Sequence, residues 1–215
     1  MSKPSRLIRG SAGLAAIAAA FAADHAVTGG LELHSENWAW HLARVLSRVG
    51  EWQYVLVPGL LLVAYFSWRG KSETGRLLFL ALAAATLTGM MATVVRSVTC
   101  RTRPGVHQPQ GFYGPWHDSH WLIGNSDFGS FPSGHTATLA GLTAAAWLVR
   151  RRLAVAAALF TAAVAWSRLA LWRHHFSDVV AAVVFAMFFS PWMFRLLDAW
   201  TRQRWAAWRS RLLKP

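Results

Sequence analysis

Two histidines and one aspartate stand at spacings that suit nucleophilic catalysis. His174 and Asp178 are four residues apart, so on a helix their side chains share one face. A carboxylate placed there can hold the imidazole in one tautomer and stabilise its charged form, as an activated nucleophile requires. His135 is then available as the general acid that protonates a departing oxygen. Taken alone, such a pair is more often a structural contact, and His175 competes with His174 because it lies three residues from Asp178.

Three arginines and one serine–glycine step are of the types that bind a tetrahedral anion. Arg96 and Arg103 form an Arg-x6-Arg-Pro pattern, and Arg168 belongs to a Ser-Arg step further along the chain. Three guanidiniums can surround a phosphate and neutralise the charge that develops during its transfer. Ser133 and Gly134 stand where a loop enters an expected helix, and there free backbone N–H groups and the positive helix end favour an anion. Each pattern also has a plainer interpretation, since arginines anchor helix ends and Ser133 can cap a helix.

The composition indicates a membrane protein in which helices position these residues. Hydrophobic residues make up 54% of the 215 and charged residues 14%, whereas charged residues reach about a quarter of ordinary soluble domains. Thirteen tryptophans fit a chain that meets two bilayer interfaces. A helix needs roughly 20 residues to cross the hydrocarbon core. We therefore expect residues 1–215 to form a single all-α domain, a polytopic membrane protein with a six-transmembrane-helix bundle whose spans lie near 7–27, 53–68, 77–95, 134–149, 153–172 and 177–197.

Two further segments are amphipathic, and the first span has an alternative interpretation. Residues 35–50 place Trp38 and other apolar side chains on one helical face, with Arg44 and Arg48 off it, which predicts an interfacial helix. Trp and Arg alternate in a similar way in the tail, 200–215. The first apolar segment has the basic start and apolar run of a secretory signal peptide, but its length favours a membrane span.

The distribution of basic residues predicts the membrane topology. The formal net charge is +13, and 15 of the 22 Lys and Arg fall in four stretches on one side of the expected bilayer: 3–9, 69–76, 150–152 and 195–214. This positive-inside bias places both termini in the cytoplasm and the motif-bearing helix ends outside, together with the loop 96–133. A nucleic-acid binder would not spread its charge in four patches along one membrane face, so we expect no nucleic-acid partner.

Seven arginines remain on the outer side, against this trend. Two of them belong to the interfacial helix, and the other five lie at outer helix ends or in the long loop: Arg96, Arg101, Arg103, Arg168 and Arg173. Arginines at the outer membrane surface run against the positive-inside trend, and binding of an anion would explain their presence there. The His–Asp pair, the arginines and the Ser-Gly step therefore converge on one membrane face.

Together the motifs resemble those of the type 2 phosphatidic acid phosphatase (PAP2) superfamily of membrane lipid phosphatases. That family's pattern is Lys-x6-Arg-Pro, then Pro-Ser-Gly-His, then Ser-Arg-x5-His-x3-Asp. The second and third elements match in full at 132–135 and 167–178, and the spacing selects His174 over His175. The first element departs at one position, where Arg96 replaces the usual Lys and a planar fork stands in place of a compact ammonium.

The resemblance implies a hydrolase that needs no metal or other cofactor. His174 would attack phosphorus and form a phosphohistidine, Asp178 would support it, and His135 would protonate the lipid oxygen before water releases phosphate. The residues implied to bind the phosphoryl oxygens are Arg96, Arg103, Ser133, Gly134 and Arg168. The implied partners are the bilayer and a lipid phosphate or diphosphate. An outward-facing site in a bacterial inner membrane suits undecaprenyl diphosphate, phosphatidylglycerol phosphate or a lipid A phosphate.

Several alternatives stay open at this point. Vanadate-dependent haloperoxidases have a similar pocket, although six membrane spans argue against that soluble class, and a lipid or anion transporter would bind without turnover. In the loop 105–131, His117, Asp118 and His120 lie close together without forming a convincing metal cluster. The aromatic side chains of this loop suit either interfacial anchoring or a lid over the headgroup. Asp24 is expected at the water boundary, with a place on a substrate route as the alternative.

Overall fold

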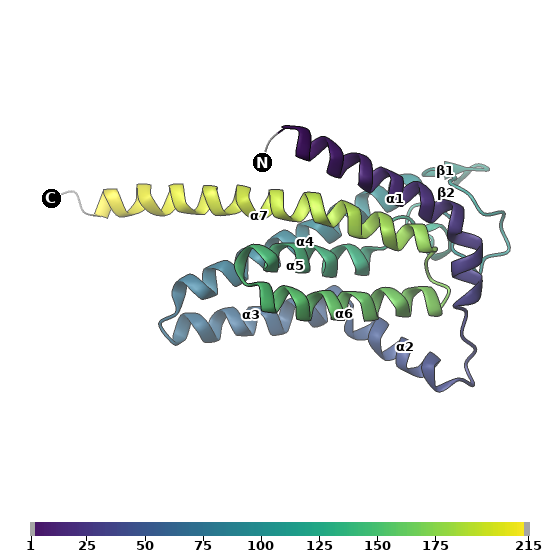
Figure 1. The fold of residues 1–215 in the computed structure, drawn as a ribbon, viewed down its shortest axis with the longest axis horizontal. Helices are drawn as coiled ribbons and strands as arrows, with labels where there is room; N and C mark the ends of the chain where they lie inside the picture. Colours follow the sequence, from purple (N-terminus) through teal and green to yellow (C-terminus); the bar gives the residue numbers. More distant parts are fainter. Residues whose placement is uncertain (1–2, 213–215) are drawn as a thin grey trace.

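The computed structural model describes residues 3–212, with side chains from 8 to 203, as a bundle of helices (Figure 1). Its α-helices are α1 (Lys3–Gly30), α2 (Trp38–Val49), α3 (Trp52–Trp68), α4 (Ser72–Thr99), α5 (Gly134–Val149), α6 (Arg151–Ala170) and α7 (Phe176–Leu212). The long α4–α5 connection contains a short 3-10 helix, η1 (Ser126–Phe128), and two strands, β1 (Trp116–His117) and β2 (His120–Trp121). The prediction of a helical protein is confirmed for the bulk of the chain, and within the described residues the hairpin departs from it.

The hairpin consists of a Trp-His strand and a His-Trp strand on either side of a two-residue turn. Trp116 pairs with Trp121 in an antiparallel register. Between the strands, Asp118 and Ser119 have φ angles of 46° and 64°, the positive values that a tight hairpin turn of this length requires. Glycine or asparagine usually supplies this conformation. Because neither stands at these two positions, the sequence pattern did not indicate a hairpin.

Four helices in the described part of the chain are long and apolar enough to cross a membrane: Ile8–Gly30, Ser72–Thr99, Arg151–Ala170 and Phe176–Gln203. A fifth span arises if α2 and α3, which are bent by 54° relative to each other, count as one broken span. α5 has 16 residues and is shorter than the roughly 20 that a straight span needs. The prediction of membrane helices is confirmed, whereas the count of six stays a prediction.

Helix boundaries differ most from expectation at the C-terminal end. The sequence predicted a span over 177–197 and a separate amphipathic tail, but α7 runs without a break from Phe176 to Leu212. The residues after 197 are rich in Arg and Ala, which are strong helix formers. The change from apolar to basic composition therefore marks a change of surroundings rather than the end of a helix.

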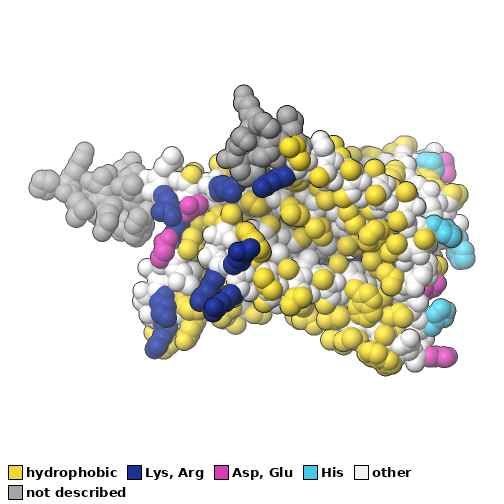
Figure 2. All heavy atoms as spheres, in the orientation of Figure 1, with side chains coloured by type: hydrophobic (Ala, Val, Ile, Leu, Met, Phe, Trp, Pro, Cys, Tyr) yellow, Lys and Arg dark blue, Asp and Glu magenta, His cyan; other side chains and the backbone are white. Residues whose placement is uncertain are grey.

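The outer surface of the bundle is apolar along its middle (Figure 2). Large side chains such as Leu61, Leu159 and Met187 are 66%, 69% and 64% exposed. A surface that faces water rarely carries a contiguous apolar area of this extent. In this view the Lys and Arg side chains gather at the end of the bundle opposite the α4–α5 connection (Figures 1 and 2). Such a surface suits a bilayer, with acyl chains around the middle of the helices.

Small residues allow α4, α5 and α7 to approach one another closely. Ala84, Ala137 and Ala182 are fully buried, and a Cβ atom added at Gly89 would lie only 2.0 Å from Thr138 Oγ1. Lipid tails are as apolar as the helix surfaces, so no hydrophobic effect drives helices together within a bilayer. Their association depends instead on close packing, which small side chains at the contacts allow. Because α4 runs opposite to α5 and α7, its C-terminus meets their N-termini at one end of the bundle (Figure 1).

Candidate active site

The three sequence motifs meet at this end of the bundle. Arg96 lies in the last turn of α4 and His135 in the first turn of α5, while His174 lies in the short connection between α6 and α7. His135 interacts electrostatically with both of them and with Arg103 and Arg168. The structure thus brings together the residues that the motifs had predicted to share a site.

One ring nitrogen of His174 is committed to a hydrogen bond with the backbone. The side chain is 1% exposed, and its Nδ1 atom lies 2.8 Å from the carbonyl oxygen of Ser130. A carbonyl oxygen can only accept, so Nδ1 carries the proton and Nε2 keeps its lone pair. The sequence had suggested that Asp178 fixes this tautomer, but its Oδ2 atom lies 3.6 Å from Nδ1. The Ser130 carbonyl therefore takes the role that the His–Asp spacing had suggested for the carboxylate.

Asp178 organises the backbone around the histidine. Its side chain is fully buried, and Oδ2 accepts hydrogen bonds from the Ser130 hydroxyl and, at 2.7 Å, from the His175 backbone N–H. Its Oδ1 atom accepts from Arg101 Nη1 at 2.6 Å. The carboxylate thus ties together the two segments that enclose His174. Its negative charge also remains close enough to stabilise a positive charge on the imidazole.

His175 faces a different environment from its neighbour. Its Nε2 atom lies 3.1 Å from the carbonyl oxygen of Thr102, so this nitrogen must donate. The side chain is therefore engaged in holding the α4–α5 connection against the start of α7. This geometry agrees with the motif spacing, which had selected His174.

Two arginines have buried nitrogen atoms without partners. The Nε atoms of Arg103 and Arg168 are buried and form no hydrogen bond within the described residues. Arg168 donates from Nη1 to the Ser47 hydroxyl on α2, and Arg103 is held through its backbone N–H, 2.9 Å from the carbonyl oxygen of Asp127. Buried polar groups are normally paired. These nitrogens therefore suit an oxyanion that would accept from both side chains.

Like charges crowd this part of the site. Burial, together with nearby Arg173 and Arg96, lowers the pKa of Arg103 to about 10. The guanidinium still carries its charge at neutral pH. Repulsion among neighbouring cations raises the free energy of the unliganded site, and an anion between them would relieve it.

Ser133 and Gly134 contribute in different ways at the start of α5. The Ser133 backbone N–H donates to the Asp178 carbonyl oxygen at 3.2 Å, and its hydroxyl lies 3.0 Å from Thr136 Oγ1. Its own amide is therefore not available to an anion, contrary to the sequence-based expectation. A Cβ atom at Gly134 would lie 3.5 Å from Arg96 Nη1, so the helix start lies directly beside that guanidinium. The first-turn amides that follow Ser133 lie at the positive end of the helix.

A buried ion network, which the sequence did not reveal, lies behind Asp178. Arg101 donates from Nη2 to Asp24 Oδ2 at 2.8 Å and from Nη1 to Asp178 and the Ser177 hydroxyl, both at 2.6 Å. Asp24 also accepts from the Ser177 backbone N–H at 2.7 Å. The sequence had grouped Arg101 with the anion-binding arginines and placed Asp24 at the water boundary. The structure pairs them with each other, and the pairing holds α1 against the site.

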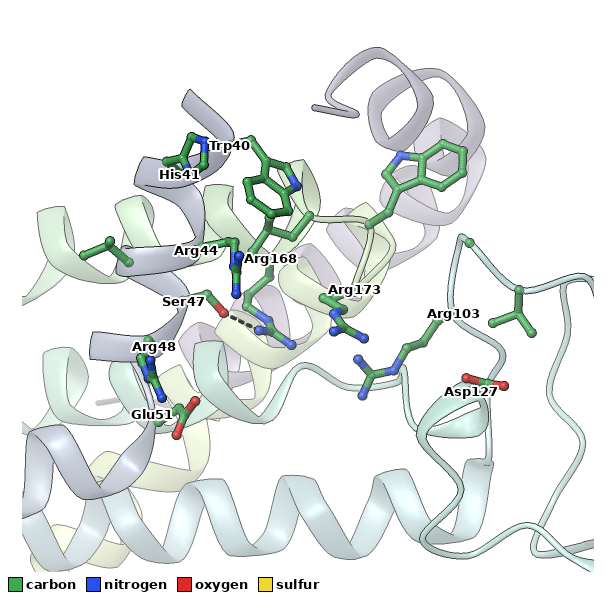
Figure 3. A pocket seen from close by; sticks show the side chains of 15 residues that line it. Trp40, His41, Arg44, Ser47, Arg48, Glu51, Arg103, Asp127, Arg168 and Arg173 are labelled. Carbon is green, nitrogen blue, oxygen red and sulfur yellow. Dashed lines mark hydrogen bonds between the residues drawn. The ribbon is translucent and has the colours of Figure 1, made fainter. Parts of the chain in front are cut away.

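A large cavity opens in front of the arginines (Figure 3). Its volume is about 810 Å³, and Arg103, Arg168 and Arg173 line it together with Arg44 and Arg48 of α2. The sequence had assigned α2 to the membrane interface alone. Only the packing of α2 on α6 brings its arginines to the same cavity, and no local pattern in the sequence indicates that packing.

The histidine-rich hairpin does not form a metal cluster. His117 Nε2 lies 3.3 Å from Asp118 Oδ2, and His120 Nδ1 lies 2.6 Å from the Asp118 backbone oxygen. No group of three or more His, Cys, Asp or Glu side chains that could hold a metal ion occurs between residues 8 and 203.

Acidification is expected to destabilise the protein through His174. Burial lowers the pKa of its imidazole to about 4 from the ordinary 6.5. Because the folded-state pKa is the lower one, the unfolded chain takes up a proton first as the pH falls. Stability that is fully present above pH 6.5 is therefore lost between pH 6.5 and 4, by roughly 3 kcal/mol for this group.

Thermal unfolding in detergent from pH 7 to pH 4 measures this loss. The His174→Gln variant has no titrating group at this position and should lose less stability across the same pH range. Equal losses in the variant and the wild type would contradict the assignment.

The class of protein follows from a comparison with protein families. Residues 76–202, more than half of the chain, match the model of the PAP2 superfamily. The chain therefore belongs to the PAP2 superfamily, and the resemblance seen in its motifs is confirmed.

Individual relatives include both a curated protein and solved structures. Lipid A 1-phosphatase of Rhizobium johnstonii is 27% identical over 164 residues, which cover 70% of this chain and 64% of that protein. The chain thus spans less than two thirds of the length of this relative. A transmembrane PAP2-type phosphatidylglycerolphosphate phosphatase from Bacillus subtilis has a similar fold, with a TM-score of 0.57, 18% identity, and coverage of 94% of this chain and 98% of that one. Aquifex aeolicus LpxE gives a TM-score of 0.53 and 18% identity, covering 76% and 88% of the two chains.

Proposed function

We propose that this protein hydrolyses a phosphate or diphosphate of a membrane lipid at the extracytoplasmic face, through a phosphohistidine intermediate. The observation that carries the proposal is the tautomer of His174. Its Nδ1–H donates to the Ser130 carbonyl oxygen at 2.8 Å, which leaves the lone pair on Nε2 for attack. The same site contains Arg103 and Arg168, whose buried Nε atoms have no partner among the described residues.

In the first half of the reaction, His174 Nε2 attacks phosphorus. The P–N bond forms while the bond from phosphorus to the lipid oxygen breaks, and His135 gives its proton to that oxygen. Arg96, Arg103 and Arg168 neutralise the charge on the phosphoryl oxygens. The first-turn amides of α5, at Gly134 and beyond, add hydrogen-bond donors from the helix end.

In the second half, water attacks phosphorus and the P–N bond breaks. His135 accepts the proton of the water, and inorganic phosphate leaves with His174 restored. Asp178, with Oδ2 at 3.6 Å from Nδ1, stabilises the positive charge of the phosphorylated ring. Ser133 acts by positioning, because its backbone N–H holds the carbonyl of Asp178.

The proposed location is the bacterial inner membrane, with both termini in the cytoplasm. The basic residues at the end of the bundle opposite the site support this orientation, because Lys and Arg favour the cytoplasmic side (Figure 2). Six spans would follow if α3 and the short α5 also cross, within a single domain covering residues 1–215 and with α2 at the interface.

A panel of lipids tests the function and the substrate. Purified protein in detergent is expected to release phosphate from at least one of phosphatidylglycerol phosphate, lipid A, undecaprenyl diphosphate and phosphatidic acid, with EDTA present. The lipid A and phosphatidylglycerolphosphate enzymes among the relatives put those two substrates first. Binding without phosphate release from any lipid would favour a transporter. Activity that EDTA abolishes and a metal ion restores would contradict the metal-free mechanism.

A further inference from the structure

α2 presents three different faces to its surroundings. One face carries large exposed apolar side chains: Trp38, Leu42, Val45 and Val49. A second face is buried against α6 at Ala43 and Ser47, and just beyond the helix a Cβ atom added at Gly50 would lie 2.5 Å from Val164 Cγ1. The third face lines the cavity of the site with His41, Arg44 and Arg48. A helix that only anchors a chain at an interface needs two faces, one apolar and one polar. Interfacial anchoring therefore does not explain the third face, which lines the cavity.

Arg44 and Arg48 on this face, and Arg173 across the cavity, form no ion pair with a carboxylate among the described residues. Arg44 packs over the ring of Trp40, with its guanidinium carbon 4.8 Å from the ring centre. Its charged end is thus held at a fixed place at the cavity wall. Stacking of this kind orders a long side chain without neutralising it.

The cavity carries more positive charge than one phosphate group requires. Five arginines and two carboxylates line it. Arg44, Arg168, Arg173 and Arg103 all point toward a common space, although they come from α2, α6, the α6–α7 connection and the α4–α5 connection (Figure 3). A volume of about 810 Å³ is in the range that accommodates a whole ligand. Arg103 and Arg168 serve the scissile phosphate in the proposed reaction. Arg44, Arg48 and Arg173 therefore remain for another anionic group.

We propose that Arg44, Arg48 and Arg173 form a second anion subsite, which binds a second phosphate group on the same lipid headgroup. The inference rests on the proposed function and narrows its substrate to lipids that carry two phosphate groups. The second group is attached either directly, as in a diphosphate, or elsewhere on the headgroup. A guanidinium fork suits phosphate in both cases, because it donates two parallel hydrogen bonds.

The competing explanation is a general attraction of α2 to anionic lipids in the bilayer. The orientation of the arginines favours the cavity, since Arg44 and Arg48 line the same space as Arg103 and Arg168. Of the exposed apolar side chains of α2, Val45 borders this space, whereas Trp38, Leu42 and Val49 do not line it. A surface attraction would affect all substrates alike, whereas a subsite distinguishes them by their second phosphate.

The double variant Arg44→Gln/Arg48→Gln tests the subsite in micelles of a neutral detergent. Two substrate pairs are compared: a polyprenyl diphosphate with its monophosphate, and a glycolipid carrying two separate phosphates with its one-phosphate form. For at least one pair, the ratio of kcat/KM between the two-phosphate and the one-phosphate lipid is expected to fall at least tenfold, mainly through KM. The pair whose ratio falls identifies how the second phosphate is attached.

Two further variants serve as controls. Arg152→Gln removes an exposed arginine of α6 that does not line the cavity and should leave both ratios as in the wild type. Arg44→Lys/Arg48→Lys keeps the charge and should recover part of the lost ratio. Unchanged ratios in the glutamine variant, with turnover retained, overturn the inference alone. An equal loss on all four lipids, which grows when anionic lipid is added to the micelles, overturns it in favour of surface attraction.

Calorimetry separates the inference from the proposed function. If no lipid releases phosphate, the proposed hydrolysis is wrong, and titration of the purified protein with orthophosphate, inorganic pyrophosphate and a sugar carrying two separate phosphates then decides the subsite. Tighter binding of pyrophosphate or of the sugar bisphosphate than of orthophosphate by the wild type, lost in the glutamine variant, supports a second anion subsite. Equal binding of all three anions, or no effect of the substitutions, overturns it.

Discussion

Replacing His174 with alanine is expected to lower kcat by on the order of 10⁴-fold or more, because loss of an attacking group removes the covalent route. Nε2 of His174 is the nitrogen left with a lone pair by the bond from Nδ1 to Ser130. The Nε2 atom of the neighbouring His175 is not available in its place, since it donates to the Thr102 carbonyl oxygen. The arginines proposed to bind phosphate are unchanged in this variant, so KM is expected to change much less than kcat. Phosphate release from the preferred lipid, measured at saturating substrate, checks both expectations.

His175→Gln is the matched control for this experiment. A glutamine amide can still donate to Thr102, so the variant should keep kcat within about tenfold of the wild type. With substrate labelled by ³²P, an alkaline quench should recover label on the wild-type protein and none on the His174→Ala variant. Turnover by His174→Ala at the wild-type rate, or label that survives in it, would exclude this residue as the nucleophile.

Local spacing was enough to predict which residues gather at the site. Arg96, His135 and His174 lie at helix ends, and the alternating direction of consecutive spans decides at which side of the membrane each end falls. Hydrophobic stretches of helix length are visible in the sequence. The side of the membrane at which each motif is expected therefore followed from counting the spans. The meeting of the motifs was predictable for this reason, although α7 proved longer and α5 shorter than a standard span.

Contacts between segments far apart in the chain were not predictable in the same way. The Ser130 carbonyl that fixes the tautomer of His174 comes from the α4–α5 connection, 44 residues away. Any residue has a backbone carbonyl, so no residue type marks this one. Spacing within a helix pointed instead to Asp178, the nearest side chain of suitable chemistry. His174 lies in the connection before α7 rather than on the helix that carries Asp178, and Oδ2 is 3.6 Å from Nδ1, so the four-residue spacing alone did not produce a short hydrogen bond.

The role of α2 was hidden for a related reason. Its amphipathic pattern is the same whether its polar face meets water or lines a cavity, because both surroundings favour charged side chains. Ser47 gives a further example, since its hydroxyl accepts from Arg168 across more than a hundred residues of sequence. The hydrophobic pattern thus predicted the exposed apolar face of the helix, while the surroundings of its other faces depended on packing against α6.

The network of Asp24, Arg101 and Asp178 leads to the second large expected effect. All three residues are buried, with exposed fractions of 8%, 7% and 0%. One guanidinium faces two carboxylates, at 2.8 Å and 2.6 Å. Removing the cation would leave two buried negative charges near each other without compensation. Breaking a buried ion pair by deleting one partner costs about 3–5 kcal/mol.

Arg101→Met is therefore expected to lower the free energy of unfolding by about 3–5 kcal/mol. It should also slow turnover by roughly 10²-fold, because misplacement of a catalytic group by about 1 Å has an effect of that size. Asp178 would lose the hydrogen bond from Arg101 to its Oδ1 atom. Because Asp178 ties together the two segments that enclose His174, those segments would become less firmly held. Thermal or denaturant unfolding in detergent, together with phosphate release below the unfolding temperature, measures the two effects separately.

Asp24→Asn distinguishes an electrostatic network from a loss of packing. The amide is nearly the same size as the carboxylate, and its oxygen can still accept from the Ser177 backbone N–H. One carboxylate then remains opposite Arg101, so charge is balanced and the expected loss is only about 1–2 kcal/mol. Adding Asp24→Asn to Arg101→Met should partly restore stability, since the second substitution removes one of the two uncompensated charges. Losses that simply add would contradict this coupling, and they would mean that Arg101 stabilises the protein by filling space between Phe21 and Phe112 rather than by joining α1 to Asp178.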